Sequence, residues 1–282
     1  MNPDVVDDII RRALEEDAPW GDITSEAFLP ESARAQASLV AREPGVLSGI
    51  EVFARVFELV DAGAVIELLA DDGVSFEIGD VLARVDGTAR GVLRAERIAL
   101  NLCQRMTGIA TLTTRYVQAV AGTPARIVDT RKTTPGLRML ERKAVRDGGG
   151  HNHRYSLSDA ALAKDNHLAI LQQAGIPIGD AIRAARQRLG HTTHLEVEVD
   201  RIEQIEPVVA AGVDTIMLDN FSPAQLREGV AIVAGRALVE ASGGVDLDTV
   251  GEIARCGVDV ISVGALTHSV RALDLGLDMA IT

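Results

Sequence analysis

The sequence contains few aromatic residues, only two cysteines and no apolar run long enough to cross a membrane. Aromatic residues make up 3% of its 282 residues while 47% are hydrophobic, so the core must consist mainly of aliphatic side chains. Cys103 and Cys256 lie far apart in apolar helical contexts, which favours buried reduced thiols over a disulfide or a metal site. Residues 1–18 form an acidic amphipathic pattern that differs from a secretory signal, so we expect a soluble, cytoplasmic protein.

Positive charge is also scarce, with 28 Lys and Arg residues against 41 Asp and Glu residues and a net charge of −13. This sign opposes the phosphate backbone of nucleic acid, which is therefore a poor candidate partner. Residues 126–165 are the exception, because they carry nine basic and five acidic residues and contain all three lysines. Lys132 and Lys164 end predicted strands, where a compact positive charge suits a functional site. We interpret Lys143, which is flanked by helical residues, as a compositional accident.

The first third of the chain has the pattern of a small α/β domain with antiparallel strands. Apolar side chains at helical spacing predict a first helix over residues 5–14. Three strands separated by turn pairs are predicted at 64–69, 74–78 and 81–85. A long helix is then predicted over residues 90–120, with a break at Gly108.

The rest of the chain alternates short aliphatic strands with helical segments, which places the protein in the α/β class. The predicted strands are 125–129, 160–164, 194–200, 215–219, 237–241 and 260–263. Alternation of this kind builds a parallel sheet with right-handed crossovers. The number of units fits a closed α/β barrel.

Polar side chains gather where these predicted strands end, which is where parallel α/β sheets bind their ligands. Strand alternation puts Glu196, Glu198 and Asp200 on one face, where they form either an exposed edge or a cation-binding rim. The next strand also ends in an acid, Asp219, and this favours a rim that suits Mg²⁺. Glycine-containing stretches at Gly148–Arg154, Ser242–Gly244 and around Gly264 let backbone N–H groups approach a phosphate.

At this point the motifs resemble a known family, the quinolinate phosphoribosyltransferases. The central match consists of Asp129–Arg138, Glu141, Lys143–Val145, Gly148–Gly150, Asn152–Arg154 and Lys164–His167. It continues through Glu16–Asp17, Gly21–Thr24, Ala41–Glu43, Gly45–Leu47, Ala95–Arg97, Asn101, Gly108–Thr111, Glu196–Glu198, Met217–Phe221, Glu240–Gly244 and Val263–Ser269. Nearly the whole chain is covered. Ser156 and Ala163 depart from the family pattern beside the pocket motif without removing a charged group.

The resemblance implies a fold of an N-terminal α/β sandwich domain followed by a C-terminal α/β barrel. In this arrangement residues 1–24 form a helix packed on the sandwich domain, which itself spans residues 25–106. Residues 107–265 form the catalytic barrel, and residues 266–282 form a helix that returns to the sandwich. The resemblance also implies a homodimer whose active site is shared between subunits.

The activity that the resemblance implies is phosphoribosyl transfer to quinolinate with decarboxylation, in NAD biosynthesis. The implied quinolinate-binding residues are Arg97, Thr130, Arg131, His153, Arg154 and Lys164, with the arginine at position 97 supplied by the neighbouring subunit. The implied residues for phosphoribosyl diphosphate are Lys132, Lys164, Glu198, Asp219, Ser242, Gly243, Gly244, Val263, Gly264, Ala265 and His268. Lys132, Glu198 and Asp219 are the expected catalytic residues. Glu198 and Asp219 are also expected to bind Mg²⁺, directly or through water.

Three other functions compete with this interpretation. One is a paralogue of the same fold that acts in molybdate metabolism, although the complete sets Asn152–Arg154 and Lys164–His167 argue against it. A second is a Schiff-base aldolase that uses Lys132 or Lys164 as an amine nucleophile. The third is a sensor that binds phosphoribosyl diphosphate without turnover. A sensor would not need residues for a second anionic substrate, so the cationic residues implied for quinolinate argue against it.

Overall fold

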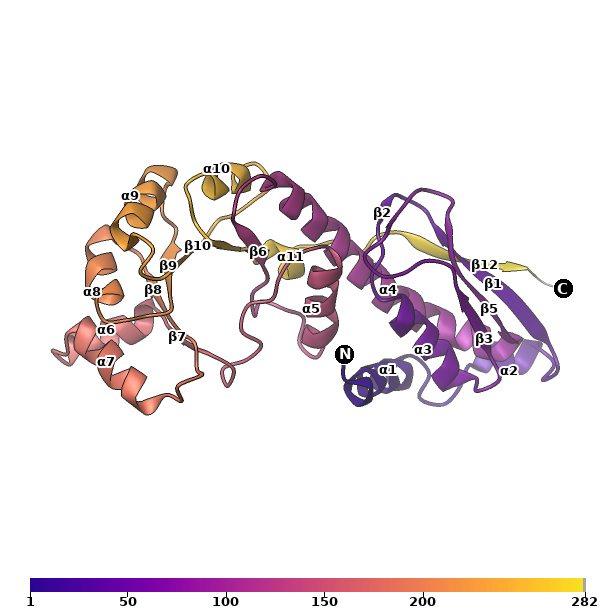
Figure 1. The fold of residues 1–282 in the computed structure, drawn as a ribbon. Coiled ribbons are helices and arrows are strands. Elements are labelled where there is room, and N and C mark those ends of the chain that lie inside the picture. The colour runs from indigo at the N-terminus through magenta and orange to yellow at the C-terminus, as the bar shows by residue number, and fades with distance from the viewer. Residues whose placement is uncertain (281–282) are drawn as a thin grey trace. The chain divides into compact units, whose positions relative to one another are not determined.

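The computed structural model describes residues 1–280 and divides into two compact units (Figure 1). The first unit contains residues 1–114, residues 133–149 and the chain from Thr267, and the second contains residues 115–132 and 150–266. Within the described residues, no helix combines the length and the apolar character that a membrane span requires.

The first unit is built on an antiparallel sheet of four strands in the order β12-β1-β5-β3. The strands are β1 (Arg34–Ala41), β3 (Val65–Leu68), β5 (Val81–Thr88) and β12 (Leu275–Ala280). A two-stranded pair, β2 (Gly45–Val46) with β4 (Ser75–Phe76), stands apart from this sheet. The helices are α1 (Pro3–Asp17), α2 (Ile23–Phe28), α3 (Ile50–Val60), α5 (Arg138–Asp147) and most of α4 (Ala89–Ala119).

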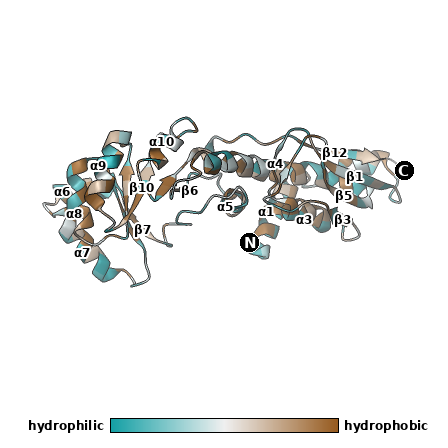
Figure 2. Cartoon of the chain, turned by 45° about the horizontal axis from the view of Figure 1, so that its top comes forward, coloured by the Kyte–Doolittle hydropathy of each residue, from teal (hydrophilic) through white to brown (hydrophobic). Residues whose placement is uncertain are grey.

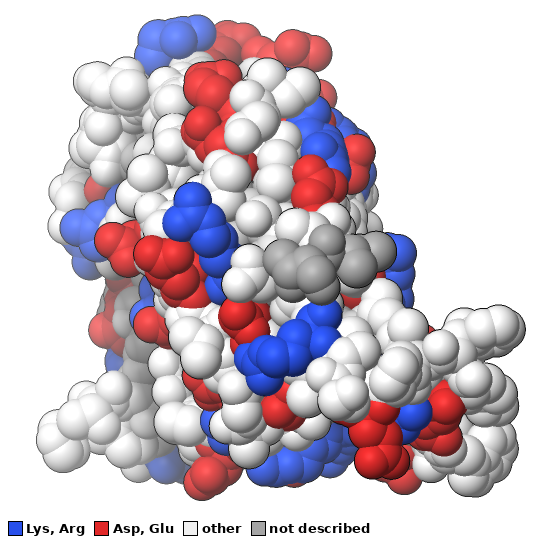
Figure 3. Space-filling view, turned by 90° about the vertical axis from the view of Figure 1, so that its right-hand side faces the viewer, with Lys and Arg blue, Asp and Glu red and all other residues white. Residues whose placement is uncertain are grey.

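The sheet of the first unit has one buried and one exposed face, as period-two strands require. Along β1 the side chains of Ala35, Ala37 and Leu39 are buried, and the residues between them are exposed or half-buried. Across the other face, Arg34 pairs with Asp86 and Arg84 pairs with Glu67. Figure 3 shows the result on this side of the unit, where acidic and basic side chains are intermixed.

The end of the chain corrects one prediction, because it forms a strand rather than a helix. Strand β12 pairs antiparallel with β1, with Leu277 opposite Leu39. The apolar residues Leu275, Leu277 and Met279 alternate with residues of other types, which is the period of a strand. The expected return to the sheet of the first unit is therefore present in extended form, and residues 281 and 282 lie outside the described part.

Helix α4 runs without a break, so the predicted interruption at Gly108 is also wrong. The glycine has a different purpose: a Cβ placed there would lie 2.2 Å from the backbone oxygen of Arg271. Only a residue without a side chain lets the last segment of the first unit pass so close to the helix.

The second unit is a barrel-like parallel sheet of six strands in the order β6-β11-β10-β9-β8-β7. The strands are β6 (Arg126–Val128), β7 (Ala161–Ala163), β8 (Leu195–Val199), β9 (Thr215–Asp219), β10 (Leu238–Ser242) and β11 (Val260–Ser262), as the sequence predicted. The helices are α6 (Asp165–Gln173), α7 (Ile178–Arg188), α8 (Ile205–Val209), α9 (Pro223–Val233) and α10 (Val250–Ala254), with the 3₁₀ turn η1 (Ile202–Gln204). The short α11 (Ala265–His268) begins in this unit and ends in the first.

Burial on both faces explains why these strands read as aliphatic runs. On β8 and β9, Val197, Ile216 and Leu218 are fully buried, and Figure 2 shows the hydrophobic colouring along β10 and β6. Helices α6 to α9 follow the strands and cover the outer side of this part of the sheet (Figure 1). The inner side is thereby left to the polar side chains that alternate with the aliphatic ones.

The packing confirms the prediction for the cysteines and corrects the interpretation of Lys143. Cys103 and Cys256 are buried, unoxidised thiols, as predicted. Lys143 is not accidental: its ammonium group bonds to Asp147 at 2.6 Å and to Asp72 at 2.5 Å, which ties α5 to the loop between β3 and β4. Its role is structural rather than catalytic.

The close approach at Gly108 predicts that Gly108→Ala destabilises the protein. The added methyl group gains about 1 kcal/mol of helix propensity but must push the Arg271 backbone away, which costs roughly 1–3 kcal/mol and more when backbone has to move. We expect a lower free energy of unfolding in chemical denaturation. Gly179→Ala in α7 is the control, because its nearest neighbour is the flexible Arg183 side chain at 3.4 Å; equal behaviour of the two variants would contradict the explanation.

Candidate active site

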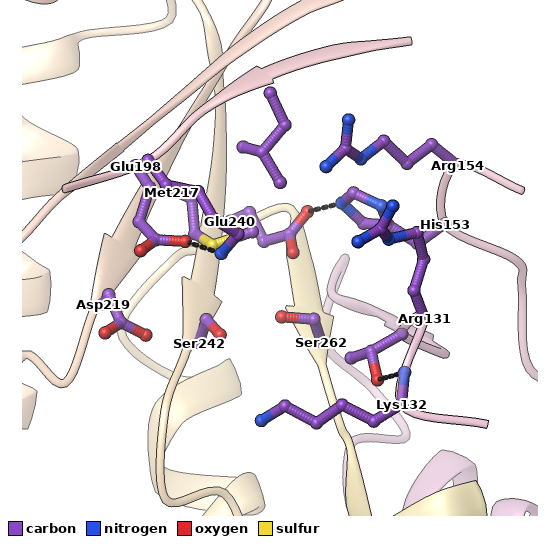
Figure 4. A pocket seen from close by; sticks show the side chains of 13 residues that line it. Arg131, Lys132, His153, Arg154, Glu198, Met217, Asp219, Glu240, Ser242 and Ser262 are labelled. Carbon is purple, nitrogen blue, oxygen red and sulfur yellow. Dashed lines mark hydrogen bonds and ion pairs between the residues drawn. The ribbon is translucent and has the colours of Figure 1, made fainter. Parts of the chain in front are cut away.

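A cavity of about 370 Å³ opens at the carboxyl ends of the parallel strands in the second unit (Figure 4). Residues from β7, β8, β9, β10 and β11 and from the segments that follow β6 all contribute to it. Its lining consists of Thr130, Arg131, Lys132, His153, Arg154, Leu162, Lys164, Glu198, Met217, Asp219, Glu240, Ser242 and Ser262. This is the position at which α/β sheets and barrels bind their ligands.

The buried carboxylate of Asp129 holds two cationic segments together at one side of the cavity. Its Oδ1 accepts a hydrogen bond from the backbone N–H of His153 at 2.7 Å, and its Oδ2 accepts from the Asn152 amide at 2.6 Å. A short parallel bridge between Val128 and His151 aligns the same two segments. The donor-rich loop is therefore fixed beside the end of β6.

An ion pair between neighbouring strands forms the opposite side. The Lys164 ammonium at the end of β7 bonds to the Glu198 carboxylate on β8. The Glu198 side chain is 11% exposed, whereas that of Lys164 is 45% exposed. The lysine thus balances a buried acid while its exposed part stays within reach of a ligand. Asp219, at the end of β9, is held in place by the Asn220 amide at 2.7 Å.

A second cluster of charge lies deeper, between Glu196 of β8, Glu240 of β10 and His153. The His153 Nε2 atom is 3.1 Å from a Glu196 oxygen and 3.4 Å from a Glu240 oxygen. Burial opposes protonation of the imidazole, but the hydrogen bonds to both carboxylates outweigh it and raise the pKa of His153 to about 10. Burial and the neighbouring Glu240 also raise the pKa of Glu196, against the effect of His153.

The remaining cations of the cavity repel one another. Burial, followed by the nearby Arg131 guanidinium, lowers the pKa of Arg154. Arg154 donates a hydrogen bond to the backbone oxygen of Ala160 at 2.9 Å, and this bond fixes the direction of the Arg154 side chain. Cations kept close together in a partly desolvated cavity favour the entry of an anion, because the anion relieves their repulsion.

The glycine stretch after β10 allows two strand ends to approach closely. Gly243 has a φ of +91°, and a Cβ at this position would lie 2.2 Å from the Asn220 side-chain oxygen and 2.9 Å from its backbone nitrogen. Asn220 itself has a positive φ and donates its backbone N–H to the Ser242 oxygen at 2.9 Å. The ends of β9 and β10 are thereby brought together beside Asp219.

Most of the sequence-predicted site residues meet in this one cavity. Those in the lining are Thr130, Arg131, Lys132, His153, Arg154, Lys164, Glu198, Asp219 and Ser242. Gly243, Gly244, Val263, Gly264 and Ala265 belong to the same unit without lining it. Arg97, exposed on α4, and His268 belong to the first unit and are not part of the lining.

Of the three acids predicted on one strand face, only Glu198 lines the cavity, and four lining residues were missed. Asp200 follows the end of β8 and is exposed, so the expected face of three acids reduces to Glu196 and Glu198. The missed residues are Leu162, Met217, Glu240 and Ser262. Each lies two positions before a residue singled out at a strand end, and alternate residues of a strand share a face. Extending the alternation backwards from each strand end would have found all four.

Two family models match the chain and together span almost its whole length. The model described as quinolinate phosphoribosyl transferase, C-terminal domain, matches residues 109–278, and the N-terminal domain model of the same family matches residues 22–107.

Named relatives agree with these models. The chain is 46% identical over 282 residues to a nicotinate-nucleotide pyrophosphorylase [carboxylating] of Mycobacterium leprae, with 98% of both chains covered. It is 40% identical to a probable enzyme of the same name from Bacillus subtilis, covering 95% of this chain and 91% of the relative. Among solved structures, NadC from Streptococcus pyogenes matches with a TM-score of 0.94 and 39% identity, over 100% of this chain and 99% of that one.

The cationic cavity predicts that Lys132→Ala weakens the binding of inorganic diphosphate. A hydrogen bond to a charged group contributes about 1.5–3 kcal/mol, so we expect a dissociation constant raised by roughly tenfold or more in titration calorimetry. Arg227→Ala is the control, because Arg227 is an exposed cation of α9 that pairs with Glu252 outside the cavity. A loss of the same size in both variants would show only the effect of net charge.

Proposed function

The chain belongs to the quinolinate phosphoribosyltransferase family, and we propose on that premise that it makes nicotinate mononucleotide from quinolinate and phosphoribosyl diphosphate, releasing diphosphate and CO₂. The observation that carries the proposal is the gathering of Arg131, Lys132, Arg154 and Lys164 with His153 around one cavity. Two substrates that are both polyanions need this many cations. The reaction is a step of NAD biosynthesis.

Quinolinate presents two adjacent carboxylates, which suit the side of the cavity formed by Arg131, His153 and Arg154. Guanidinium groups bind carboxylates through two parallel hydrogen bonds and stay charged at every physiological pH. The Arg154 side chain is already oriented by its bond to Ala160. Thr130 lines the same cavity, and its hydroxyl would complete the acceptor site.

Phosphoribosyl diphosphate suits the other side, where Lys132 and Lys164 supply point charges for its phosphates. Ser242 and the glycines after it allow backbone N–H groups to approach the same phosphates. Glu198 and Asp219 lie at the ends of neighbouring strands and line this side of the cavity, and carboxylates are ligands that Mg²⁺ prefers, so these two residues would hold Mg²⁺. When bound there, Mg²⁺ would neutralise charge on the departing diphosphate.

The chemistry requires positioning and electrostatic stabilisation rather than a covalent enzyme intermediate. The pyridine nitrogen attacks the anomeric carbon while the bond to diphosphate breaks, and positive charge develops on the ribose ring. Glu198 and Asp219 stabilise that ring, and Lys132 and Lys164 stabilise the leaving group. The bond to the 2-carboxylate then breaks, the pyridinium takes up its electron pair, and a proton replaces the released CO₂.

The aldolase alternative requires a neutral lysine amine, and the geometry disfavours it. The Lys164 nitrogen is in an ion pair with Glu198, and an ammonium held in this way has no lone pair for attack on a carbonyl. The names of the relatives also give no support to the paralogue of molybdate metabolism.

We further propose that the enzyme is a cytoplasmic homodimer in which Arg97 enters the active site of the neighbouring subunit. Arg97 is exposed on α4 and does not line the cavity of its own chain. A third guanidinium from a partner would complete the clamp on the acceptor. The two unoxidised cysteines suit a reducing compartment.

The activity is tested by measuring CO₂ and diphosphate released from quinolinate and phosphoribosyl diphosphate. We expect release in equal amounts in the presence of magnesium and none after chelation with EDTA. Arg154→Ala should lose roughly 10² to 10³ in kcat/KM, as removal of a preorganised donor does, while Arg227→Ala retains activity. Absence of turnover in the unmodified protein with magnesium would overturn the proposal.

The shared site is tested by mixing two inactive variants, Arg97→Ala and Lys132→Ala. If each site takes Arg97 from one subunit and Lys132 from the other, exchange of subunits produces heterodimers with one intact site. Activity should return to about a quarter of that of the unmodified enzyme. A mixture that stays inactive, although mass spectrometry shows heterodimers, would place both residues in the site of one subunit.

A further inference from the structure

Two buried acids, Glu196 and Glu240, contact His153, although an imidazole can bind a substrate carboxylate without either of them. The two acids come from strands β8 and β10, which are separated by β9, and both point at the same nitrogen of the imidazole. Each carboxylate side chain is 4% exposed, and that of His153 is 14% exposed. Figure 4 shows the imidazole between Glu240 and the arginines of the cavity.

Two acceptors on one nitrogen define the state of the ring. The Nε2 atom lies within reach of both Glu196 and Glu240, and a carboxylate oxygen can only accept, so this nitrogen carries a hydrogen when the two acids are ionised. A neutral ring would then have a lone pair on Nδ1, which repels a carboxylate ligand. A charged ring carries hydrogens on both nitrogens and attracts it.

The surroundings explain why two acids are needed to keep this charge. Arg154 is the next residue along the chain and Arg131 lines the same cavity, so both disfavour another cation. Asp129 accepts a hydrogen bond from the backbone N–H of His153. Glu198 is already paired with Lys164. This leaves Glu196 and Glu240 as the acids that bond to the imidazole, and their effect is large enough to raise its pKa to about 10 in spite of burial.

A second observation supports a functional role for Glu196 and Glu240: each carboxylate has one oxygen without a hydrogen-bond partner among the described residues. Oε1 of Glu196 and Oε1 of Glu240 are buried without a hydrogen-bond partner in the described part of the chain. Buried carboxylate oxygens without partners are costly, so the pair is not an arrangement that stability alone would favour. Such a cost is typical of sites arranged for function.

We propose that Glu196 and Glu240 are positioning residues that keep His153 as a fixed imidazolium facing the cavity, so that it recognises a carboxylate of the acceptor. The inference rests on the proposed function for the identity of that acceptor. It assigns a role to two residues that do not have to touch either substrate.

The sign of the pH dependence follows from the raised pKa. In the unmodified protein His153 stays charged throughout the neutral range and loses its proton only near pH 10. When both acids are replaced by glutamine, burial and the neighbouring arginines remain and now lower the pKa to the ordinary value of about 6.5 or below. The imidazole then loses its charge as the pH rises through about 6.5 or below, and it is neutral at pH 8.

The first experiment follows the His153 ring by NMR between pH 5.5 and 9 in protein labelled at histidine. We expect no titration of His153 in the unmodified protein and titration near or below pH 6.5 in the Glu196→Gln, Glu240→Gln double variant. Glu228→Gln, which removes an exposed acid of α9 in the same unit, is the matched control and should behave as the unmodified protein. An unchanged His153 in the double variant would overturn the proposal. A ring signal that shifts on addition of EDTA would also overturn it, because the cluster would then bind a metal ion.

The second experiment separates binding from chemistry. At pH 8 the single variants Glu196→Gln and Glu240→Gln should raise the KM for quinolinate by roughly tenfold, with much smaller changes in kcat and in the KM for phosphoribosyl diphosphate. The increase should shrink as the pH is lowered to 6, where His153 regains its proton, and Glu240→Asp should restore part of the affinity. Equal losses in all three kinetic constants at every pH would indicate a merely structural role.

The two experiments also separate this inference from the proposed function. If the unmodified protein does not turn over quinolinate but His153 titrates as expected, the proposed function fails and the charge-setting role of the two acids stands. If turnover is normal and His153 is insensitive to both acids, only the inference fails.

Discussion

Balance of buried charge at the carboxyl ends of the parallel strands is the constraint on which the cavity depends. Strand β8 places Glu196 and Glu198 side by side on its inner face, and β10 adds Glu240. Three buried carboxylates are not tolerated without compensation. The compensation comes from Lys164 on the neighbouring strand and from His153 on the loop that Asp129 holds in place. The same cations line the cavity.

Fold class and strand positions could be predicted because they depend on local composition. Aliphatic runs such as Thr215–Asp219 have no other stable placement than a buried strand, and the charged residues that end them lie at the ligand-binding edge. The helix expected over residues 266–282 was wrong for residues 275–280, which form β12, because the partner that decides their conformation, β1, lies more than 200 residues earlier. The break expected at Gly108 failed for a similar reason, since the need for a glycine comes from Arg271, far along the chain.

The cavity shows the same division between local and distant information. Asp219 ends its strand, Lys164 directly follows one, and Lys132 lies in the segment after β6, so all three could be identified from the strands beside them in the sequence. Glu240 could not be assigned a role from its own strand, because that role depends on His153, which the chain brings to it from nearly ninety positions away. Whether a buried acid is paired is a property of the neighbouring strand, and strand order is the part of a fold that a single sequence specifies least.

Strand β12 has a consequence for how the chain is completed during its synthesis. The four-stranded sheet of the first unit takes its outer strand from the last described residues, although β1 and β5 are among the first elements made. Until β12 has been synthesised, the edge of β1 that pairs with it has no partner, whereas residues 115–266 already contain every strand of the parallel sheet. The strands around the cavity are therefore synthesised before the sheet of the first unit can be completed, and chains that lack β12 carry an open edge prone to aggregation.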